Sequence, residues 1–239
     1  VYGARPGRPI LYRIPTTGKR PIEYSCAGLP ESLTLDGKTG IIKGTVNKSG
    51  SYELNLIASN ELGKDKKAMT LKIGDTIALT PPLGWNSWNC WGCSVTPQKV
   101  KDAADAMINS DLVNYGWNYV NIDDCWQSTM RDKETNRIYP NDKFLDMAGL
   151  AEYVHSKGLK IGLYTCAGDM TCQELEGSEG YERTDIMTYA DLGYDYVKVD
   201  WCFNHGMDAK TRYNLFGEAI EDAPRDIVYS ICNWGFDDP

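Results

Sequence analysis

Basic clusters and long apolar runs are both missing from this 239-residue sequence. Its formal net charge is −8, and no group of Lys and Arg residues is interleaved with aromatic residues. Nucleic acids are bound by basic patches that release counterions from phosphates, so a nucleic-acid partner is disfavoured. No apolar stretch approaches the roughly 20 residues that a membrane-crossing helix needs. We therefore expect neither a nucleic-acid-binding protein nor a membrane-spanning one.

Ligands for a catalytic metal ion are also scarce. The chain has two histidines, His155 and His205. Cys90 and Cys93 form one Cys-x-x-Cys pair, but no second pair is present to complete a zinc ribbon. We accordingly expect no metal ion and no other cofactor.

Cysteine is plentiful by comparison. Eight cysteines are spread along the chain. This distribution fits disulfides better than zinc, and disulfides indicate an oxidising compartment. Cys26 and Cys166 could instead be buried free thiols. We expect a secreted or periplasmic protein.

The first 75 residues are rich in turn formers between short runs. In residues 51–58, apolar side chains alternate with Glu53 and Asn55, which predicts a half-buried antiparallel strand. Several such runs at close spacing predict a small β-sandwich. The turn Gly28-Leu29-Pro30 and the run Thr39-Gly40-x-Ile42-x-Gly44-Thr45 resemble the immunoglobulin-like modules of bacterial carbohydrate enzymes. The resemblance implies a bacterial protein. Carbohydrate binding by this module is one alternative, but its strands show no row of exposed aromatic residues, so we expect a spacer or packing partner.

A joint follows this module. Thr80-Pro81-Pro82 contains consecutive prolines, which stiffen a linker and cannot continue a ladder of strands. We therefore divide the chain into an immunoglobulin-like module at residues 1–75, a linker at 76–82 and a larger domain at 83–239.

Short apolar strands alternate with helical patterns in the larger domain. One helix is expected to begin at Pro97, with Thr96 as its N-cap. The other predicted helices are 150–156, 185–192 and 209–220, and the predicted strands are 83–88, 117–124, 159–164, 194–202 and 226–232. Repeated β–α units specify a parallel sheet, which is either doubly wound or closed into a barrel.

Polar and aromatic residues occur where these strands end. They are Trp88, Asp123, Asp124, Tyr164, Lys198, Asp200, Asn233 and Trp234. In a (β/α)₈ barrel all such ends meet at one mouth. No glycine-rich phosphate loop follows the first strand, which weakens the dinucleotide-binding alternative. We predict an α/β fold: about the first five units of a (β/α)₈ TIM barrel, preceded by a small all-β immunoglobulin-like sandwich.

Lys198 and Asp200 stand one residue apart at the end of a core strand. Taken alone, this pair is a salt-bridged strand end, and Asp123 with Asp124 is as readily a capping pair. Together at one mouth they suit a sugar, because carboxylates accept hydrogen bonds from hydroxyls and tryptophan offers an apolar face to the ring. A carboxylate can also attack or stabilise an anomeric carbon.

Five motifs lie in order between residues 82 and 234. They are Leu83-Gly84-Trp85-Asn86-Ser87-Trp88-Asn89, Tyr119-Val120-Asn121-Ile122-Asp123-Asp124-Cys125-Trp126, His155-Ser156-Lys157-Gly158-Leu159-Lys160-Ile161-Gly162-Leu163-Tyr164, Tyr196-Val197-Lys198-Val199-Asp200-Trp201-Cys202 and Ile227-Val228-Tyr229-Ser230 before Cys232. In this order and spacing they resemble the amino-terminal part of glycoside hydrolase family 27, the clan D family of α-galactosidases (melibiases) and α-N-acetylgalactosaminidases.

The resemblance implies a retaining hydrolase that releases terminal α-linked galactose. Asp200 would be the nucleophile and form a covalent glycosyl-enzyme intermediate. Lys198 would keep Asp200 ionised and bind the sugar. The implied substrate-binding residues are Trp88, Asp123, Asp124, Tyr164, Lys198, Cys172, Cys202 and Asn233. The resemblance also implies the disulfides Cys93–Cys125 and Cys172–Cys202, and it gives Cys90, Cys166 and Cys232 no partner.

Two features depart from the family pattern. Asn233 stands where α-galactosidases commonly have a glutamate that helps recognise the 2-position of the sugar. No residue matches the family's acid/base aspartate, and Asp237 and Asp238 come too early for it. We expect the amino-terminal part of a longer protein, inactive by itself. An α-N-acetylgalactosaminidase, a β-L-arabinopyranosidase and a non-catalytic carbohydrate-binding protein remain alternatives, and the oligomeric state is left open.

Overall fold

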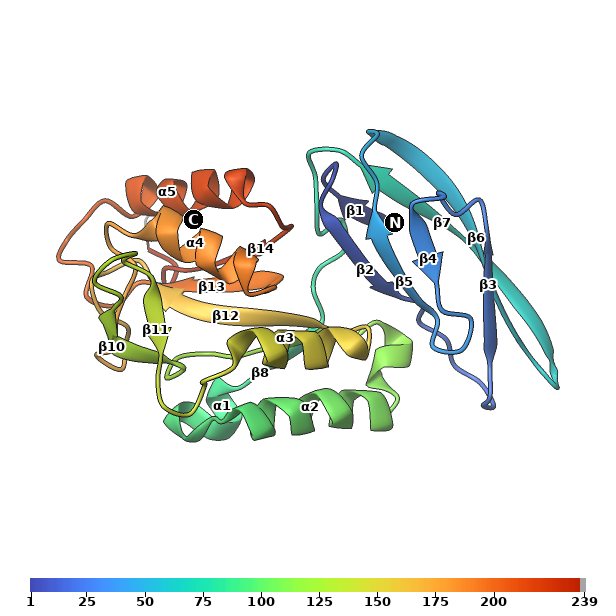
Figure 1. Ribbon diagram of the computed structural model, residues 1–239, viewed down its shortest axis with the longest axis horizontal. Coiled ribbons are helices and arrows are strands. Elements are labelled where there is room, and N and C mark those ends of the chain that lie inside the picture. The colour runs from blue at the N-terminus through green and yellow to red at the C-terminus, as the bar shows by residue number, and fades with distance from the viewer. Residues whose placement is uncertain (237–239) are drawn as a thin grey trace. The chain divides into compact units, whose positions relative to one another are not determined.

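The computed structural model describes residues 1–236 (Figure 1). Asp237 and Asp238 lie outside the described residues. Contacts divide the chain into two compact units. The first unit comprises Val1–Leu83, Asp105–Asn118 and His155–Leu159, and the second comprises Gly84–Ala104, Tyr119–Val154 and the chain from Lys160 onward.

The first unit contains two small sheets. One has the strand order β1 (Tyr2–Ala4), β7 (Gly63–Ile73), β6 (Gly50–Asn60), β3 (Glu23–Ala27), and the other has the order β2 (Pro9–Arg13), β5 (Ile41–Thr45), β4 (Leu33–Leu35). The predicted alternation in β6 is confirmed, since Leu54 and Leu56 are buried while Glu53 and Asn55 are exposed. Buried aliphatic residues of both sheets form one core. β1 pairs with β7 in parallel, in contrast to the antiparallel pairing of the other strands in these sheets.

The second unit is built on a parallel sheet of five strands. Their spatial order is β8 (Gly84–Asn86), β9 (Tyr119–Asn121), β12 (Lys160–Cys166), β13 (Tyr196–Asp200), β14 (Val228–Cys232). This spatial order equals the chain order. A doubly wound sheet would reverse its order at a switch point, whereas successive barrel strands lie side by side. The sheet is therefore an α/β half-barrel that resembles part of a TIM barrel.

Helices connect these strands as the β–α pattern predicts. They are α1 (Trp88–Trp91), α2 (Pro97–Asn109), α3 (Met147–Ser156), α4 (Glu182–Asp191) and α5 (Ala209–Asp222). The predicted cap of α2 is present, because the hydroxyl of Thr96 accepts a hydrogen bond from the Lys99 amide at 3.3 Å. α4 and α5 pack side by side (Figure 1). No helix within residues 1–236 is long and apolar enough to cross a membrane.

β12 lies in the interior of the second unit, since every residue from Ile161 to Cys166 is buried. Gly162 permits this packing. A Cβ atom at this position would lie 2.3 Å from Oδ1 of Asn121 on the neighbouring strand β9. A side chain here would therefore displace the side chain of Asn121, which lies at the end of β9 just before the two adjacent aspartates.

A hairpin of polar sequence, absent from our prediction, follows β9. It consists of β10 (Gln127–Arg131) and β11 (Ile138–Pro140). Arg131, whose side chain is 7% exposed, donates to the carboxylate of Asp185 at 2.6 Å and to that of Glu176 at 2.7 Å. A buried ion pair with Asp185 thus joins the hairpin to α4, and a partly buried one with Glu176 joins it to the loop before α4.

Candidate active site

Asp123 follows β9 and is held by hydrogen bonds to residues at the end of β8. It is 2% exposed. The side-chain amide of Asn86 donates to Asp123 Oδ2 at 2.8 Å, and the Asp123 backbone amide donates to the hydroxyl of buried Ser87 at 2.9 Å. Two polar residues at the end of one strand therefore orient a carboxylate at the end of the next.

Asp124 is held by backbone donors from two loops. Its Oδ1 accepts from the Cys125 amide at 2.7 Å, and its Oδ2 accepts from the Gln173 amide at 3.1 Å. Burial raises the pKa of Asp124, and these hydrogen bonds oppose that effect only in part. Asp124 is 1% exposed, so its carboxyl group is withdrawn from bulk water.

Lys198 and Asp200 point to the same side of β13, because residues two apart on a strand share a face. Nζ of Lys198 lies 2.9 Å from Asp123 Oδ2 and 3.8 Å from Asp200 Oδ2. Burial by itself would lower the pKa of Lys198, but the charges of Asp123 and Asp200 outweigh it and the pKa lies above its ordinary value. One ammonium group thus links the ends of β9 and β13.

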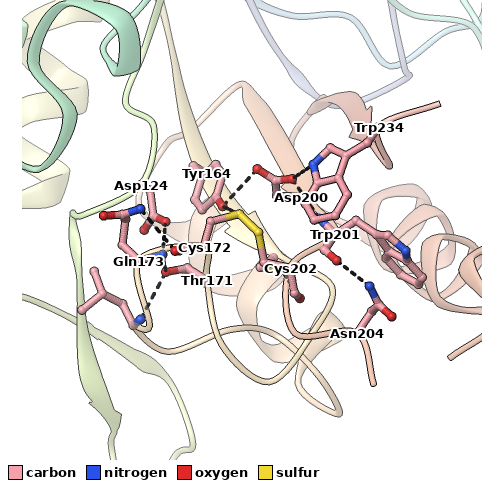
Figure 2. The surroundings of a disulfide bond; sticks show 12 residues. Asp124, Tyr164, Thr171, Cys172, Gln173, Asp200, Trp201, Cys202, Asn204 and Trp234 are labelled. Atoms are coloured by element: carbon pink, nitrogen blue, oxygen red, sulfur yellow. Dashed lines mark hydrogen bonds between the residues drawn. A yellow bond between two sulfur atoms is a disulfide. The ribbon is translucent and has the colours of Figure 1, made fainter. Parts of the chain in front are cut away.

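The Asp200 carboxylate accepts hydrogen bonds on both oxygens (Figure 2). Oδ1 accepts from the Trp201 amide at 2.9 Å and from the indole Nε1 of Trp234 at 2.8 Å. Oδ2 accepts from the hydroxyl of Tyr164 at 3.2 Å. Burial raises the pKa of Tyr164, and the charges of Asp124 and Asp200 add to the effect, so this hydroxyl stays protonated as a donor.

Two disulfides flank the carboxylates, and they are the same pairs that the family resemblance implies. Cys93 is bonded to Cys125, which follows Asp124, and Cys172 is bonded to Cys202, which lies two residues after Asp200. Figure 2 shows the second disulfide beside Tyr164, whose hydroxyl lies 3.4 Å from Cys172 Sγ. Cys26, Cys90, Cys166 and Cys232 are free thiols.

Asn233 and Trp88 are placed differently from the acidic residues. Asn233 is buried, its amide nitrogen donates to the carbonyl of Phe236, and its Oδ1 accepts from the Gly235 amide at 3.4 Å. Its side chain therefore shapes its own loop. Trp88 begins α1, and its backbone amide donates to Oδ1 of Asn86 at 2.9 Å. The stacking role of Trp88 stays a prediction.

Several residues of this site were absent from the sequence-based assignment of roles. They are Asn86, Ser87, Gln173 and Trp234. Asn86 and Ser87 lie inside the first family motif and at a strand exit, so their position was a usable signal. The loop of Gln173 gave no such signal. Trp234 adopts the left-handed backbone conformation (φ 60°), which directs its indole in a way that strand periodicity does not predict.

The charges of the site set its chemistry. Two buried carboxyl groups, those of Asp123 and Asp200, flank the ammonium group of Lys198, and the buried carboxyl group of Asp124 follows Asp123 in the chain. Such a site can accept several hydrogen bonds from a neutral polyhydroxylated ligand, and its excess negative charge can stabilise a developing positive charge. Asp123 and Asp200 are each oriented by three donors.

The free thiols should differ sharply in reactivity. Cys166 is fully buried, and burial raises the pKa of its thiol to about 12. Native Cys166 should react with iodoacetamide roughly a thousandfold more slowly than in the denatured chain, because the thiolate is the nucleophile. Exposed Cys90 should be modified first. Peptide mass spectrometry after timed alkylation measures both rates, and equal labelling of the two thiols would contradict this assignment.

Comparison with known proteins agrees with this geometry. Residues 80–237 match the family described as Alpha galactosidase A, and residues 1–74 match He_PIG, an Ig domain family. The α-galactosidase of Cyamopsis tetragonoloba is 45% identical over 163 residues, which are 67% of this chain and 39% of that protein. Alpha-galactosidase A of Cellvibrio japonicus is 43% identical over 168 residues, covering 69% of this chain and 41% of the relative.

Solved structures show the same relationship. The structure of a candidate α-galactosidase from Bacteroides fragilis aligns with this chain with a TM-score of 0.95 at 41% identity. The alignment covers 98% of this chain and 51% of the Bacteroides chain. α-Galactosidase I of Mortierella vinacea aligns with a TM-score of 0.65 at 40% identity. That alignment covers 68% of this chain and 42% of the Mortierella chain. The chain thus spans about half or less of the length of these relatives. With the family match extending over most of the chain, it belongs to the melibiase family described as Alpha galactosidase A, within glycoside hydrolase family 27.

Proposed function

We propose that the whole protein is a retaining α-galactosidase in which Asp200 is the nucleophile. One observation supports this most: both oxygens of Asp200 accept hydrogen bonds, from the Trp201 amide, the Trp234 indole and the Tyr164 hydroxyl. These donors fix the carboxylate before substrate binds. Preorganisation of this kind places a reacting atom without a further entropic cost at the moment of reaction.

In the proposed first step, an Asp200 oxygen forms a bond to the anomeric carbon while the bond to the leaving-group oxygen breaks. The product is a glycosyl ester of Asp200, which water then hydrolyses with overall retention. The Lys198 ammonium lies 3.8 Å from Asp200 Oδ2 and places a positive charge beside the proposed nucleophile. We assign no acid/base carboxyl within residues 1–236, so we propose that these residues alone do not turn over substrate.

Sugar binding is proposed to involve the other two carboxyl groups. Asp123 and Asp124 are buried and oriented by Asn86, Ser87 and Gln173, so they can accept hydrogen bonds from hydroxyls at the far edge of a galactose ring, the axial 4-hydroxyl included. The relatives named above are α-galactosidases, and one solved α-galactosidase, from Saccharomyces cerevisiae, contains raffinose. We infer an α-galactoside as the substrate.

A substrate panel tests this proposal on the whole protein. The kcat/KM for an aryl α-galactoside should exceed that for the matching α-N-acetylgalactosaminide and β-L-arabinopyranoside by roughly tenfold or more, because each analogue changes a group at the ring edge. Retention is read by proton nuclear magnetic resonance of the first sugar anomer released. Preference for either analogue would overturn the substrate, and inversion would overturn the mechanism. Binding without turnover would favour a carbohydrate-binding protein.

The first 75 residues are proposed to be a separate module that serves as a spacer or packing partner, followed by a linker at 76–82. Within residues 1–75 the exposed large apolar side chains are Val1 and Leu62, and no aromatic side chain is among them. Sugar-binding modules present aromatic faces, so this surface lacks the usual means of binding a glycan. We also propose secretion or a periplasmic location, which suits the two disulfides.

A further inference from the structure

The hydroxyl group of Thr171 lies at the centre of a turn in the loop between β12 and α4. Thr171 is fully buried. Its hydroxyl oxygen accepts hydrogen bonds from the backbone amides of Gln173 and Leu175, each at 3.2 Å (Figure 2). A threonine hydroxyl has two acceptor positions and a single proton to donate. The turn therefore occupies both acceptor positions and leaves the proton for another partner.

Asp124 is the partner that this proton can reach. The Gln173 amide is shared between Thr171 Oγ1, at 3.2 Å, and Asp124 Oδ2, at 3.1 Å, so the hydroxyl and the carboxylate face the same N–H group. Burial raises the pKa of Asp124, and a hydrogen bond with the Thr171 side chain opposes this effect. A donor to the charged form of a carboxyl group favours that form.

The turn that carries Thr171 is also held by contacts that do not involve its hydroxyl. The Thr171 amide donates to the carbonyl of Leu175 at 2.8 Å, and the Thr171 carbonyl accepts from the amide of Glu174 at 2.9 Å. The next residue after Thr171 is Cys172, which is bonded to Cys202. Removal of the hydroxyl alone should therefore leave the turn in place.

We propose that Thr171 is a positioning residue, whose hydroxyl directs its single proton to Asp124 and maintains that carboxylate as a hydrogen-bond acceptor for the substrate. The part played in substrate binding rests on the proposed function, in which Asp124 accepts from a hydroxyl at the far edge of the galactose ring. Thr171 itself need not touch the sugar. Since Asp124 is not the proposed nucleophile, loss of this support should weaken binding more than it slows chemistry.

Thr171→Val removes the hydroxyl and nearly preserves the shape of the side chain. In the whole protein, KM for an aryl α-galactoside should rise roughly tenfold while kcat changes less than about threefold, because a hydrogen bond to a charged binding group is lost. Loss of this donor raises the pKa of Asp124 further, so the acidic limb of kcat/KM should move to higher pH. The titratable side chains that face Asp124 are unchanged in this variant; they are Asp123, Tyr164 and Cys166.

The carboxyl group of Asp124 can also be titrated without any sugar. The whole protein is labelled with ¹³C in the side-chain carboxyl groups of aspartate, and the Asp124 signal is identified by its absence from Asp124→Asn. Its midpoint should lie at higher pH in Thr171→Val than in the parent, and Thr171→Ser, which keeps the hydroxyl, should restore both the midpoint and KM. This titration does not depend on the substrate, so failure of the proposed function and failure of the positioning role are distinguishable.

Thr188→Val is the matched control. Thr188 is buried, and its hydroxyl donates to the carbonyl of Thr184 within α4 at 2.7 Å, so this variant should leave the Asp124 midpoint and the acidic limb unchanged. An unchanged midpoint in Thr171→Val, or a Thr171→Ser variant that titrates like Thr171→Val, would overturn the proposal. Circular dichroism checks each fold. If Thr171→Val does not fold, Thr171→Ala should show the same direction of shift, and failure of both variants to fold would overturn the positioning role in favour of a purely structural one.

Discussion

Asp200→Asn should abolish hydrolysis of α-galactosides by the whole protein. An amide cannot form the glycosyl ester, and loss of a covalent nucleophile costs on the order of four to six powers of ten in kcat. The fold should be retained, because Oδ1 of an asparagine can still accept from the Trp201 amide and the Trp234 indole. Stopped assays with an aryl α-galactoside measure the loss.

A fluorinated glycosyl inhibitor identifies the reacting atom directly. The parent protein should be labelled on Asp200, and the variant should not be labelled at all. Asp191→Asn is the matched control, because Asp191 is half-exposed and its ion pair with Arg137 lies on the surface. It should leave both turnover and labelling unchanged. A label on another carboxyl group of the parent would show that the nucleophile was assigned wrongly.

Lys198→Met should lower the free energy of unfolding by about 3–5 kcal/mol. This change leaves the carboxylate of Asp123 buried without its ammonium partner, and breaking one side of a buried pair has about this cost. Asp123 has a side chain that is 3% exposed, and that of Lys198 is 22% exposed, so screening by solvent is small. Urea denaturation followed by circular dichroism measures the change.

The double variant K198M/D123N separates the ion pair from packing. It should recover part of the stability lost in Lys198→Met, since it removes the charge of Asp123, which makes the shorter contact with Lys198. The pKa of Lys198 is raised in the folded state, so the contribution of its charge is fully present below the unfolded value of about 10.4 and declines as pH rises through the higher folded value. The difference between parent and Lys198→Met should shrink there. A double variant less stable than Lys198→Met would contradict the charge explanation.

The strands at the centre of the second unit could be predicted because most of their residues are buried, which gives the sequence a largely apolar run. Residues 159–164 and 194–202 are dominated by apolar and β-branched residues. The first range overlaps β12, and the second contains β13. Their ends differ by a few residues. Predicted strand 117–124 is reduced to Tyr119–Asn121, because the backbone beyond it turns to direct Asp123 and Asp124 into the site. Functional residues here interrupt the regular strand.

Contacts made by loops could not be read from periodicity. Gln173 reaches Asp124 across 49 residues, and Trp234 reaches Asp200 across 34, through backbone conformations that no repeating pattern specifies. The hairpin β10–β11 was missed because its strands are largely polar and are stabilised by the buried guanidinium of Arg131. The pairing of β1 with β7 joins opposite ends of the first unit and has no local signature.

The ion pair between Lys198 and Asp123 also has a consequence for folding kinetics. It joins residues 75 positions apart: Lys198 lies on β13 and Asp123 follows β9, and β12 separates these two strands in the sheet. Closing such a long loop carries an entropic cost that only the assembled sheet can repay, and high contact order slows folding. During refolding, helical circular dichroism should therefore return before the ion pair between Lys198 and Asp123 forms.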